Sequence, residues 1–204
     1  MITNSLVIAS TIAIISIIWA EFVRDVYHLV SHLWKPLYRL HSWHHRIFKP
    51  DLSVTNENIY RQANWFNDLP ESLVMLLLTI GYGYLIISLG WISPQDQWLV
   101  WTGAGYTFLF TLGAIARGFG VPYAHEVTDV THRQGEFREL PANWLVNRTY
   151  HWRHHFDNQD AYFCGTFTFV DRIVGTALSL KGKKIAITGA FIAEQICKGA
   201  ESFT

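Results

Sequence analysis

Three long stretches of this 204-residue chain carry no charged residue, and they limit the folds that it can adopt. They cover residues 5–20, 72–92 and 97–116. Each stretch, with its flanks, approaches the roughly 20 residues that a helix needs to cross a hydrocarbon core of about 30 Å. Buried helices of a soluble bundle would instead show a polar face every 3.6 residues or so. Residues 72–92 show no such face, so we predict three membrane-spanning helices.

The first apolar stretch does not have the pattern of a cleaved signal peptide. No lysine or arginine precedes Arg24, so a basic leading region is absent. No small-residue cleavage site stands out before Glu21 either. We therefore expect this stretch to be retained as a membrane span.

The placement of basic residues predicts how the chain crosses the membrane. All 16 lysines and arginines lie within residues 24–61 and 117–198. The residues before the first zone and the hairpin at 93–96 have none. Since basic residues favour the cytoplasmic side, both zones should be cytoplasmic. All ten histidines fall within these zones. The sequence thus predicts an integral membrane protein with its active site on the cytoplasmic side.

The histidines themselves form four clusters. The clusters are His28 and His32; His41, His44 and His45; His125 and His132; and His151, His154 and His155. Positions three or four apart share one face of a helix, so the members of the first, second and last clusters should point the same way. Pro36 should end or kink the first helix, because proline cannot continue it. The bend would turn the first two clusters toward one point.

So many imidazoles exceed the needs of one metal ion, which indicates a site for two. Imidazole suits zinc, copper, iron and nickel about equally. A structural zinc usually takes cysteines, and the chain has only two. The zinc-protease motif fails because Asp129 stands where its second histidine belongs. The Glu-x-x-His pairs of soluble di-iron bundles are absent. An all-histidine dinuclear site facing a membrane remains.

Three motifs, in order, resemble those of the fatty acid hydroxylase / sterol desaturase superfamily. The resemblance covers about residues 20–178. The motifs are Asp25-x-x-His28-x-x-x-His32 with Pro36-Leu-Tyr-Arg-Leu-His41-x-x-His44-His45, then His151-x-x-His154-His155-Phe156, and the tail Phe169-Val-Asp171-Arg172-Ile-Val-Gly175-Thr176.

This resemblance implies a non-haem enzyme with two iron ions. Such enzymes use O2 and an external electron donor, of the ferredoxin or cytochrome b5 type, to hydroxylate or desaturate lipids; some relatives process fatty aldehydes. Asp25 and Asp129 are candidates to orient the ligand rings. No catalytic group beyond the metal ligands is implied. The implied ligands are His28, His32, His41, His44, His45, His125, His132, His151, His154 and His155.

His132 departs from the spacing of the family. It lies seven residues after His125, which is about 10.5 Å along a straight helix. One ion cannot easily take both rings unless the segment bends. His132 is therefore either a ligand or a supporting or surface histidine near Asp129.

Residues 181–190 resemble the first strand and turn of a short-chain dehydrogenase. The glycine-rich turn that would seat a pyrophosphate does not follow, and only 14 residues come after Ala190. We hypothesise a membrane domain at 1–180 and a tail at 181–204 that is a truncated dehydrogenase remnant. The alternative is an ordinary amphipathic C-terminal strand or helix. In either case we predict that the chain does not bind NAD(P).

The predicted fold is all-α, with about three membrane helices and a cytoplasmic cap of shorter helices that holds the metal site. The family commonly has about four spans, and a short re-entrant helix can replace the fourth.

The first functional hypothesis is a hydroxylase of a fatty acyl, sterol-like or carotenoid lipid, and the second is a desaturase or aldehyde-processing enzyme. The third is a non-catalytic membrane metal binder or transporter, which predicts ionisable residues within the spans; the three uncharged runs contain none. The fourth is an enzyme inactivated by a broken tail. We expect no nucleic-acid partner.

Overall fold

The computed structural model describes residues 2–124, 132, 145–146 and 148–176, and the statements below concern these residues. They contain no strand, only isolated bridges that join Phe48 to Val54 and Leu145 to Phe167. The all-α prediction is confirmed. In chain order the elements are α1 (Ile2–Leu33), α2 (Lys35–His44), α3 (Glu57–Ala63), the π-helix η1 (Asn64–Asp68), α4 (Leu69–Ser88), the 3-10 helix η2 (Pro94–Trp101), α5 (Thr102–Gly118), α7 (Arg148–Phe156) and α8 (Phe169–Val174).

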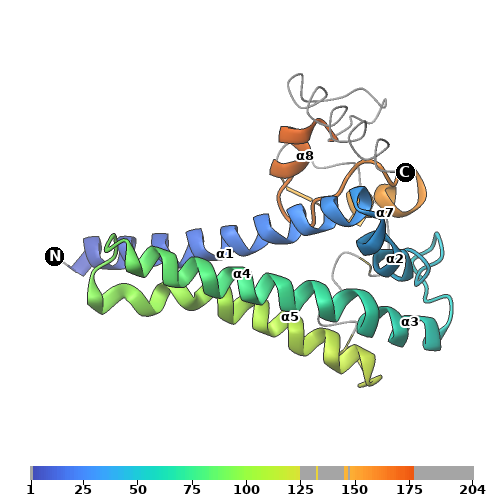
Figure 1. Ribbon diagram of the computed structural model, residues 1–204, viewed down its shortest axis with the longest axis horizontal. Helices are drawn as coiled ribbons and strands as arrows, with labels where there is room; N and C mark the ends of the chain where they lie inside the picture. Colours follow the sequence, from blue (N-terminus) through green and yellow to red (C-terminus); the bar gives the residue numbers. More distant parts are fainter. Residues whose placement is uncertain (1, 125–131, 133–144, 147, 177–204) are drawn as a thin grey trace.

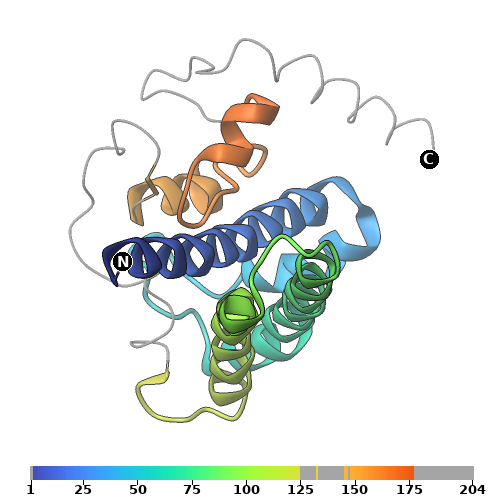
Figure 2. The ribbon, with the colours of Figure 1, turned by 90° about the vertical axis from the view of Figure 1, so that its left-hand side faces the viewer.

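Helices α1, α4 and α5 lie side by side and form the long axis of the molecule (Figure 1). Figure 2 shows the same three helices from one end, with α1 next to the α4–α5 pair. Three helical segments are long and apolar enough to cross a membrane: Val7–Leu33, Glu57–Ser88 and Pro94–Gly118. Their outward side chains include Leu77 and Leu109, which are 68% and 64% exposed. Such side chains suit contact with lipid, and the prediction of three spans is confirmed.

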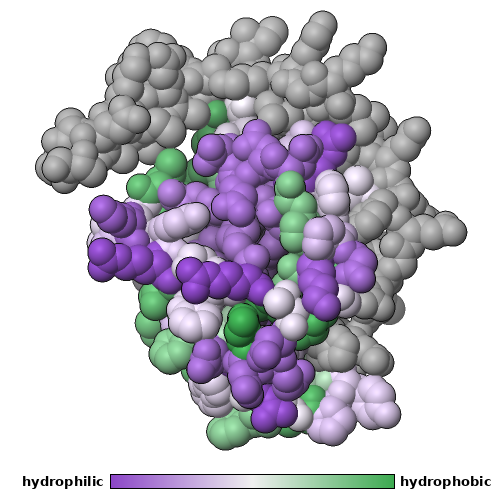
Figure 3. All heavy atoms as spheres, turned by 90° about the vertical axis from the view of Figure 1, so that its right-hand side faces the viewer, coloured by the Kyte–Doolittle hydropathy of each residue, from purple (hydrophilic) through white to green (hydrophobic). Residues whose placement is uncertain are grey.

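The long helices exceed the thickness of a membrane. Helix α1 has 32 residues, which gives a length of about 48 Å against a hydrocarbon core of about 30 Å. The C-terminal end of α1 lies where α2, α3 and α7 gather (Figure 1). Figure 3 shows that this end of the molecule is largely hydrophilic. The histidine-bearing helices therefore sit at one polar end of the membrane bundle.

The chain bends sharply between α1 and α2, as Pro36 predicts. Helix α1 ends at Leu33, and Trp34 is extended with φ −110° and ψ 109°. Pro36 occupies the first turn of α2, where a missing backbone N–H costs nothing. The bend brings His28 and His32 on α1 opposite the histidines of α2, and the predicted break is confirmed.

The bundle is closed by small residues at close helix contacts. The backbone N–H of Gly103 on α5 donates to Ser16 Oγ on α1 at 2.9 Å. A Cβ at position 103 would overlap the Ser16 carbonyl oxygen. Thr79 on α4 and Thr107 on α5 form a buried hydroxyl pair at 3.0 Å. Small residues and interhelical hydroxyl bonds of this kind are the usual means by which membrane helices associate.

A π-helical turn interrupts the second long helix just before Pro70. The N–H of Leu69 bonds to the carbonyl of Asn64, five residues back. Because proline lacks an N–H and conflicts with the carbonyl four residues earlier, the wide turn relieves the strain in a continuous helix. Asn64 and Asn67 are thereby buried, at 0% and 3% exposure. The turn thus delivers polar side chains into the interior beside α2.

Candidate metal centre

Nine histidines converge on two adjacent centres. Within each set, one nitrogen from every ring lies within 4.8 Å of all the others. The rings come from α1, from α2 and the residue that follows it, from α7 and from residue 132. The five-histidine group is His28, His32, His41, His45 and His154, and the four-histidine group is His44, His132, His151 and His155.

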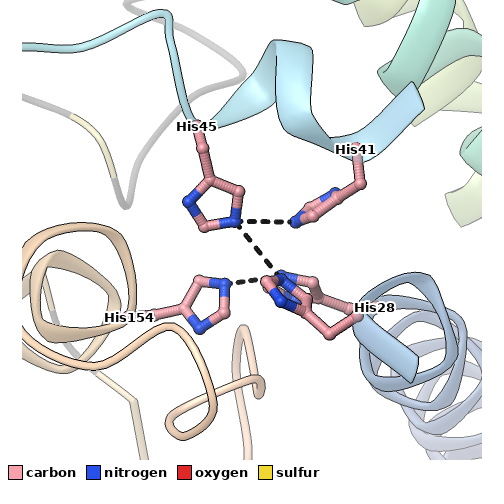
Figure 4. Close-up of side chains that lie close together, drawn as sticks. His28, His41, His45 and His154 are labelled. Carbon is pink, nitrogen blue, oxygen red and sulfur yellow. Dashed lines mark hydrogen bonds between the residues drawn. The ribbon is translucent and has the colours of Figure 1, made fainter. Parts of the chain in front are cut away.

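The five-histidine group joins three helices at one point (Figure 4). His45 Nε2 lies 3.1 Å from His41 Nε2 and 3.3 Å from His32 Nε2. His28 Nε2 lies 3.0 Å from His154 Nε2. The Nε2 atoms of α1, α2 and α7 therefore face one another across a small central space.

The four-histidine group has the same form. His132 Nε2 lies 2.8 Å from His151 Nε2 and 3.1 Å from His155 Nε2. His155 Nε2 is also 3.1 Å from His44 Nε2. The ring of Phe48 stacks on His132 with a centroid separation of 4.4 Å and an angle of 14°. His132, whose role the sequence left open, thus lies among the other rings.

Each His-x-x-His-His motif divides its histidines between the two groups. The first and last histidines of the motif, which are four residues apart, belong to one group. The middle histidine belongs to the other group. Successive residues of a helix are about 100° apart, so adjacent histidines cannot aim at the same centre. The prediction that all three rings of a motif point the same way is therefore wrong. His41 and His45 join His154 in one group, while His151 and His155 join His44 in the other.

Backbone carbonyls hold two rings of the five-histidine group in place. His28 Nδ1 lies 2.6 Å from the carbonyl oxygen of Phe163, and His154 Nδ1 lies 2.8 Å from that of Ala161. A carbonyl oxygen can only accept, so each Nδ1 carries the proton and donates it. The lone pair of each ring is then on Nε2, directed at the centre, as a metal ligand requires.

The π-turn holds a third ring through Asn67. His41 Nδ1 lies 3.0 Å from Asn67 Oδ1, and Asn67 Nδ2 donates to Asp68 Oδ1 at 2.8 Å. Since the amide nitrogen already donates to the carboxylate, the oxygen must face His41 and accept from it. Asp68 Oδ1 also lies 3.7 Å from His44 Nδ1. One turn of η1 thus contacts a ring of each histidine group.

The loop that supplies the two carbonyls is strained and firmly anchored. Tyr162, between Ala161 and Phe163, has φ 64°, which costs a non-glycine residue about 1 kcal/mol or more. Its side chain is 1% exposed. The fully buried Asp171 accepts from the Phe163 N–H at 3.0 Å and from the Cys164 N–H at 2.8 Å. The left-handed residue lets the carbonyls on either side face histidines, and Asp171 keeps the loop there.

Burial keeps the imidazoles of His41, His151, His154 and His155 neutral. It lowers the pKa of His154 to about 4, and it holds the pKa of His41, His151 and His155 well below the ordinary value of imidazole. Neighbouring imidazoles add to the effect of burial, because two positive rings would repel each other. Neutral histidine is the form that binds metal.

The donor set fits two metal ions. Several neutral nitrogens with lone pairs directed at one point repel one another unless a cation lies between them. Nδ1 atoms held by oxygen, as in His28, His41 and His154, are the usual support of metal-ligating histidines. All-imidazole sets suit zinc, copper, iron and nickel. Each group therefore could hold one ion of this class.

The remaining predicted residues have mixed outcomes. His125 and Asp129 lie outside the described residues. Asp25 is buried, and its Oδ1 accepts from the Gly165 N–H at 3.0 Å and lies 3.6 Å from the Arg24 guanidinium. Its described partners are therefore a backbone amide and an arginine, and it contributes to the site by fixing the loop that follows Phe163.

Asn67, Asp68 and Asp171 support the site although sequence reasoning did not select them. Of these three residues, only Asp171 could have been selected from the sequence, because it belongs to the tail motif that resembles the family.

A cavity of about 440 Å³ opens beside both histidine groups. Its wall includes His28, His41, His44 and His151. Ionisable side chains of the membrane helices also line it, namely Arg24, Asp68, Glu71, Tyr106 and Arg117. Tyr106 lies within the third uncharged run, whereas the four charged residues lie just outside the runs.

The sequence profile described as fatty acid hydroxylase matches residues 13–176. The chain belongs to the fatty acid hydroxylase family. The matched region contains every described histidine and the loop of Tyr162. The family resemblance inferred from the three motifs is confirmed.

A curated relative adds a second line of comparison. The monoglucosyldiacylglycerol epimerase of Synechocystis sp. (strain PCC 6803) is 56% identical over 184 residues, covering 88% of this chain and 44% of that protein. The chain therefore spans less than half the length of this relative. No solved structure matches the chain.

Proposed function

We propose that this chain is the metal-binding membrane part of an enzyme that modifies a lipid, with two iron ions held by its histidines. The observation that carries the proposal is the convergence of nine imidazoles on two centres. Within it, His125 is a further ligand, Asp129 supports the ligand rings, and Asp25 acts on them through the loop that follows Phe163. Membership of the fatty acid hydroxylase family supports lipid as the substrate class.

Breaking an aliphatic C–H bond needs an oxidant stronger than any side chain, and a bound pair of irons supplies it from O2. The side chains of this protein have other tasks. The carbonyls of Ala161 and Phe163 and the Asn67 amide fix the directions of the imidazoles. The cavity offers space for the substrate beside the rings. Three apolar helices keep the site next to the bilayer.

The first candidate reaction is hydroxylation or desaturation. In hydroxylation one atom of O2 enters the C–H bond and the other leaves as water, with two electrons and two protons supplied from outside. In desaturation two hydrogens leave the substrate and both oxygen atoms become water. Each reaction requires an external electron donor, of the ferredoxin or cytochrome b5 type. A fatty-aldehyde-processing reaction at the same site is a variant of this candidate.

The second candidate is epimerisation of a sugar head group. Its support is the identity of 56% with an enzyme named for that reaction. In an epimerisation a C–H bond at a carbinol carbon breaks and forms again on the opposite face. The product has the mass of the substrate, and no net electrons are consumed. Both candidates therefore share the cleavage of a C–H bond in a membrane lipid.

We place the site on the cytoplasmic side of the membrane. The support is an excess of exposed basic residues near the histidines, with none in the apolar hairpin at the opposite end. These residues are Lys35, Arg39, Arg46, Lys49 and Arg61.

The test combines metal analysis with lipid profiling. Detergent-purified protein should contain about two irons per chain. Membranes of cells with and without the gene are then compared by mass spectrometry and by analysis of the head-group sugar. A gain of one oxygen indicates hydroxylation, a loss of two hydrogens indicates desaturation, and an unchanged mass with a changed sugar indicates epimerisation. His154→Ala should abolish the product while the protein still inserts into membranes. Full activity of a metal-free preparation would contradict the proposal.

A further inference from the structure

The cavity beside the histidines combines apolar and ionisable walls, so a plain hydrocarbon chain would match only part of it. Besides the histidines, five of its lining side chains are ionisable and come from the membrane helices: Arg24, Asp68, Glu71, Tyr106 and Arg117. An acyl chain placed against them would remove water from charged groups without returning a hydrogen bond, which is costly. A ligand with several hydroxyl groups both donates and accepts, so it can replace that water.

Most of these charges are already paired within the protein. Arg24 contacts Glu21 and donates to Thr166 Oγ1 at 3.1 Å, and Tyr106 donates to the other oxygen of Glu21 at 2.5 Å. Asp68 lies 3.0 Å from the Arg117 guanidinium. These two networks hold the cavity wall rigid and present donor and acceptor groups at fixed positions.

Glu71 differs from the other carboxylates of the wall. It is half-buried, it lines the cavity, and among the described residues no side chain or backbone group forms a hydrogen bond or ion pair with its carboxylate. A glutamate in the first turn of a helix often stabilises the free N–H groups there. That explanation fails here, because α3, η1 and α4 form one continuous helical segment from Glu57 to Ser88. The carboxylate is therefore left available to a ligand.

Apolar groups complete the wall in a way that also fits a sugar. Met75 and Phe110 line the same cavity, and the Arg24 guanidinium lies 5.9 Å from the centre of the Phe110 ring. A sugar ring has apolar C–H faces and hydroxyl edges, so it needs both kinds of surface. Aromatic faces with a few well-placed polar groups are typical of small-ligand sites.

We infer that this cavity takes the polyhydroxylated head group of a glycosyl lipid, and that Glu71 determines specificity by accepting hydrogen bonds from its hydroxyls. The inference rests on the proposed function, since it concerns the part of the lipid that reaches the metal centre. It assigns the head group, and not the acyl chain, to the space beside His28, His41 and His44.

The test is a competition between lipids that differ only in the head group. Metal-loaded full-length protein in detergent is mixed with equal amounts of monoglucosyldiacylglycerol, diacylglycerol and free fatty acid with the same acyl chains. Native mass spectrometry then measures the bound lipid. We expect the glycolipid to be enriched about 10- to 100-fold over the other lipids, the range for hydrogen bonds to a charged group. Glu71→Gln should lose most of this enrichment, whereas Glu57→Gln, an exposed position on α3, should keep it.

The outcomes separate this inference from the function on which it rests. Equal binding of all three lipids by protein that holds its metal would overturn the inference and leave the proposed function intact. Absence of bound metal would instead overturn the proposed function. If Glu71→Gln still enriched the glycolipid fully, Glu71 would not determine the specificity for the head group. If that variant does not accumulate, Glu71→Asp, with its charge withdrawn by one methylene, should reduce the enrichment, and unchanged enrichment there would likewise overturn the role.

Discussion

The two histidine groups use the same ligand and share two helices, yet the protein supports their rings to different degrees. In the five-histidine group, oxygens of Phe163, Ala161 and Asn67 hold three Nδ1 atoms at 2.6–3.0 Å. In the four-histidine group, the buried Nδ1 atoms of His151 and His155 have no hydrogen-bond partner among the described residues, whereas in the five-histidine group this is found for His45.

This difference indicates that the two centres have different tasks. Rings held by a second set of hydrogen bonds are oriented before an ion arrives, which strengthens binding. Rings with freer Nδ1 atoms can turn, so their centre can change its coordination more easily. We therefore expect the five-histidine group to bind its ion tightly and the four-histidine group to be the more adaptable centre.

Removal of one imidazole from each group should give the largest contrast. In His151→Ala only three described imidazoles remain in the four-histidine group, whose rings also have less support, so bound metal should fall to about one ion per chain. In His32→Ala four remain in the five-histidine group, and bound metal should stay at about two. Elemental analysis of purified protein measures both, and equal losses in the two variants would break the comparison.

A chelator should remove the two ions at different rates. We expect two kinetic phases that differ by roughly 10- to 100-fold, since supporting hydrogen bonds change metal affinity by that amount. The faster phase belongs to the four-histidine group and should be missing in His151→Ala. Metal retained at timed intervals is the measurement, and a single phase in the unmodified protein would contradict the expectation.

Loss of Asn67 should weaken mainly the five-histidine group, whose ring His41 it contacts directly. Asn67→Ala removes the acceptor of His41 Nδ1, and we expect the affinity of the five-histidine group to fall about tenfold. Asn58→Ala, at an exposed position on α3, is the control. Metal-binding titrations of the two variants test this, and an unchanged affinity in Asn67→Ala would show that the hydrogen bond is not a support.

Replacement of Phe48 should have the smallest effect on metal binding, and this effect should fall on the four-histidine group. Phe48→Leu removes the ring stacked on His132, which should weaken the four-histidine group by about two- to tenfold. Phe48 also belongs to a buried cluster with Ile47. Ile47→Val therefore serves as the control, because it loosens the same cluster by about 1 kcal/mol without touching His132. Equal metal affinities in the two variants would remove the role of the stacked ring.

The main features of the fold follow from local sequence signals. The uncharged runs locate the three long helices, and Pro36 locates the bend after α1, because both depend on properties of neighbouring residues. The extended ends of the helices were harder to predict. Arg24 and Glu71 lie outside the uncharged runs, and only the packing of α1 against α4 and α5 brings them to one cavity.

The site could be predicted as a set of residues but not as a geometry. The motifs gave the ligands, whereas the partners that each histidine of α2 meets in its group depend on where α1 and α7 lie around α2. The support of His41 by Asn67 joins residues 26 positions apart and belongs to no motif. Likewise, the pairing of Glu21 with Tyr106 spans 85 positions. Such contacts arise from tertiary packing, which a single sequence does not reveal.

Helix α1 serves as a membrane anchor along most of its length and carries His28 and His32 near its end. Because one uninterrupted helix does both, the height of the metal centre above the bilayer is fixed by the number of residues between the lipid-facing side chains and these two rings. A lipid atom would then be chosen by its depth as well as by its chemistry. Carbons that are equivalent in reactivity but lie at other depths in the leaflet would remain out of reach.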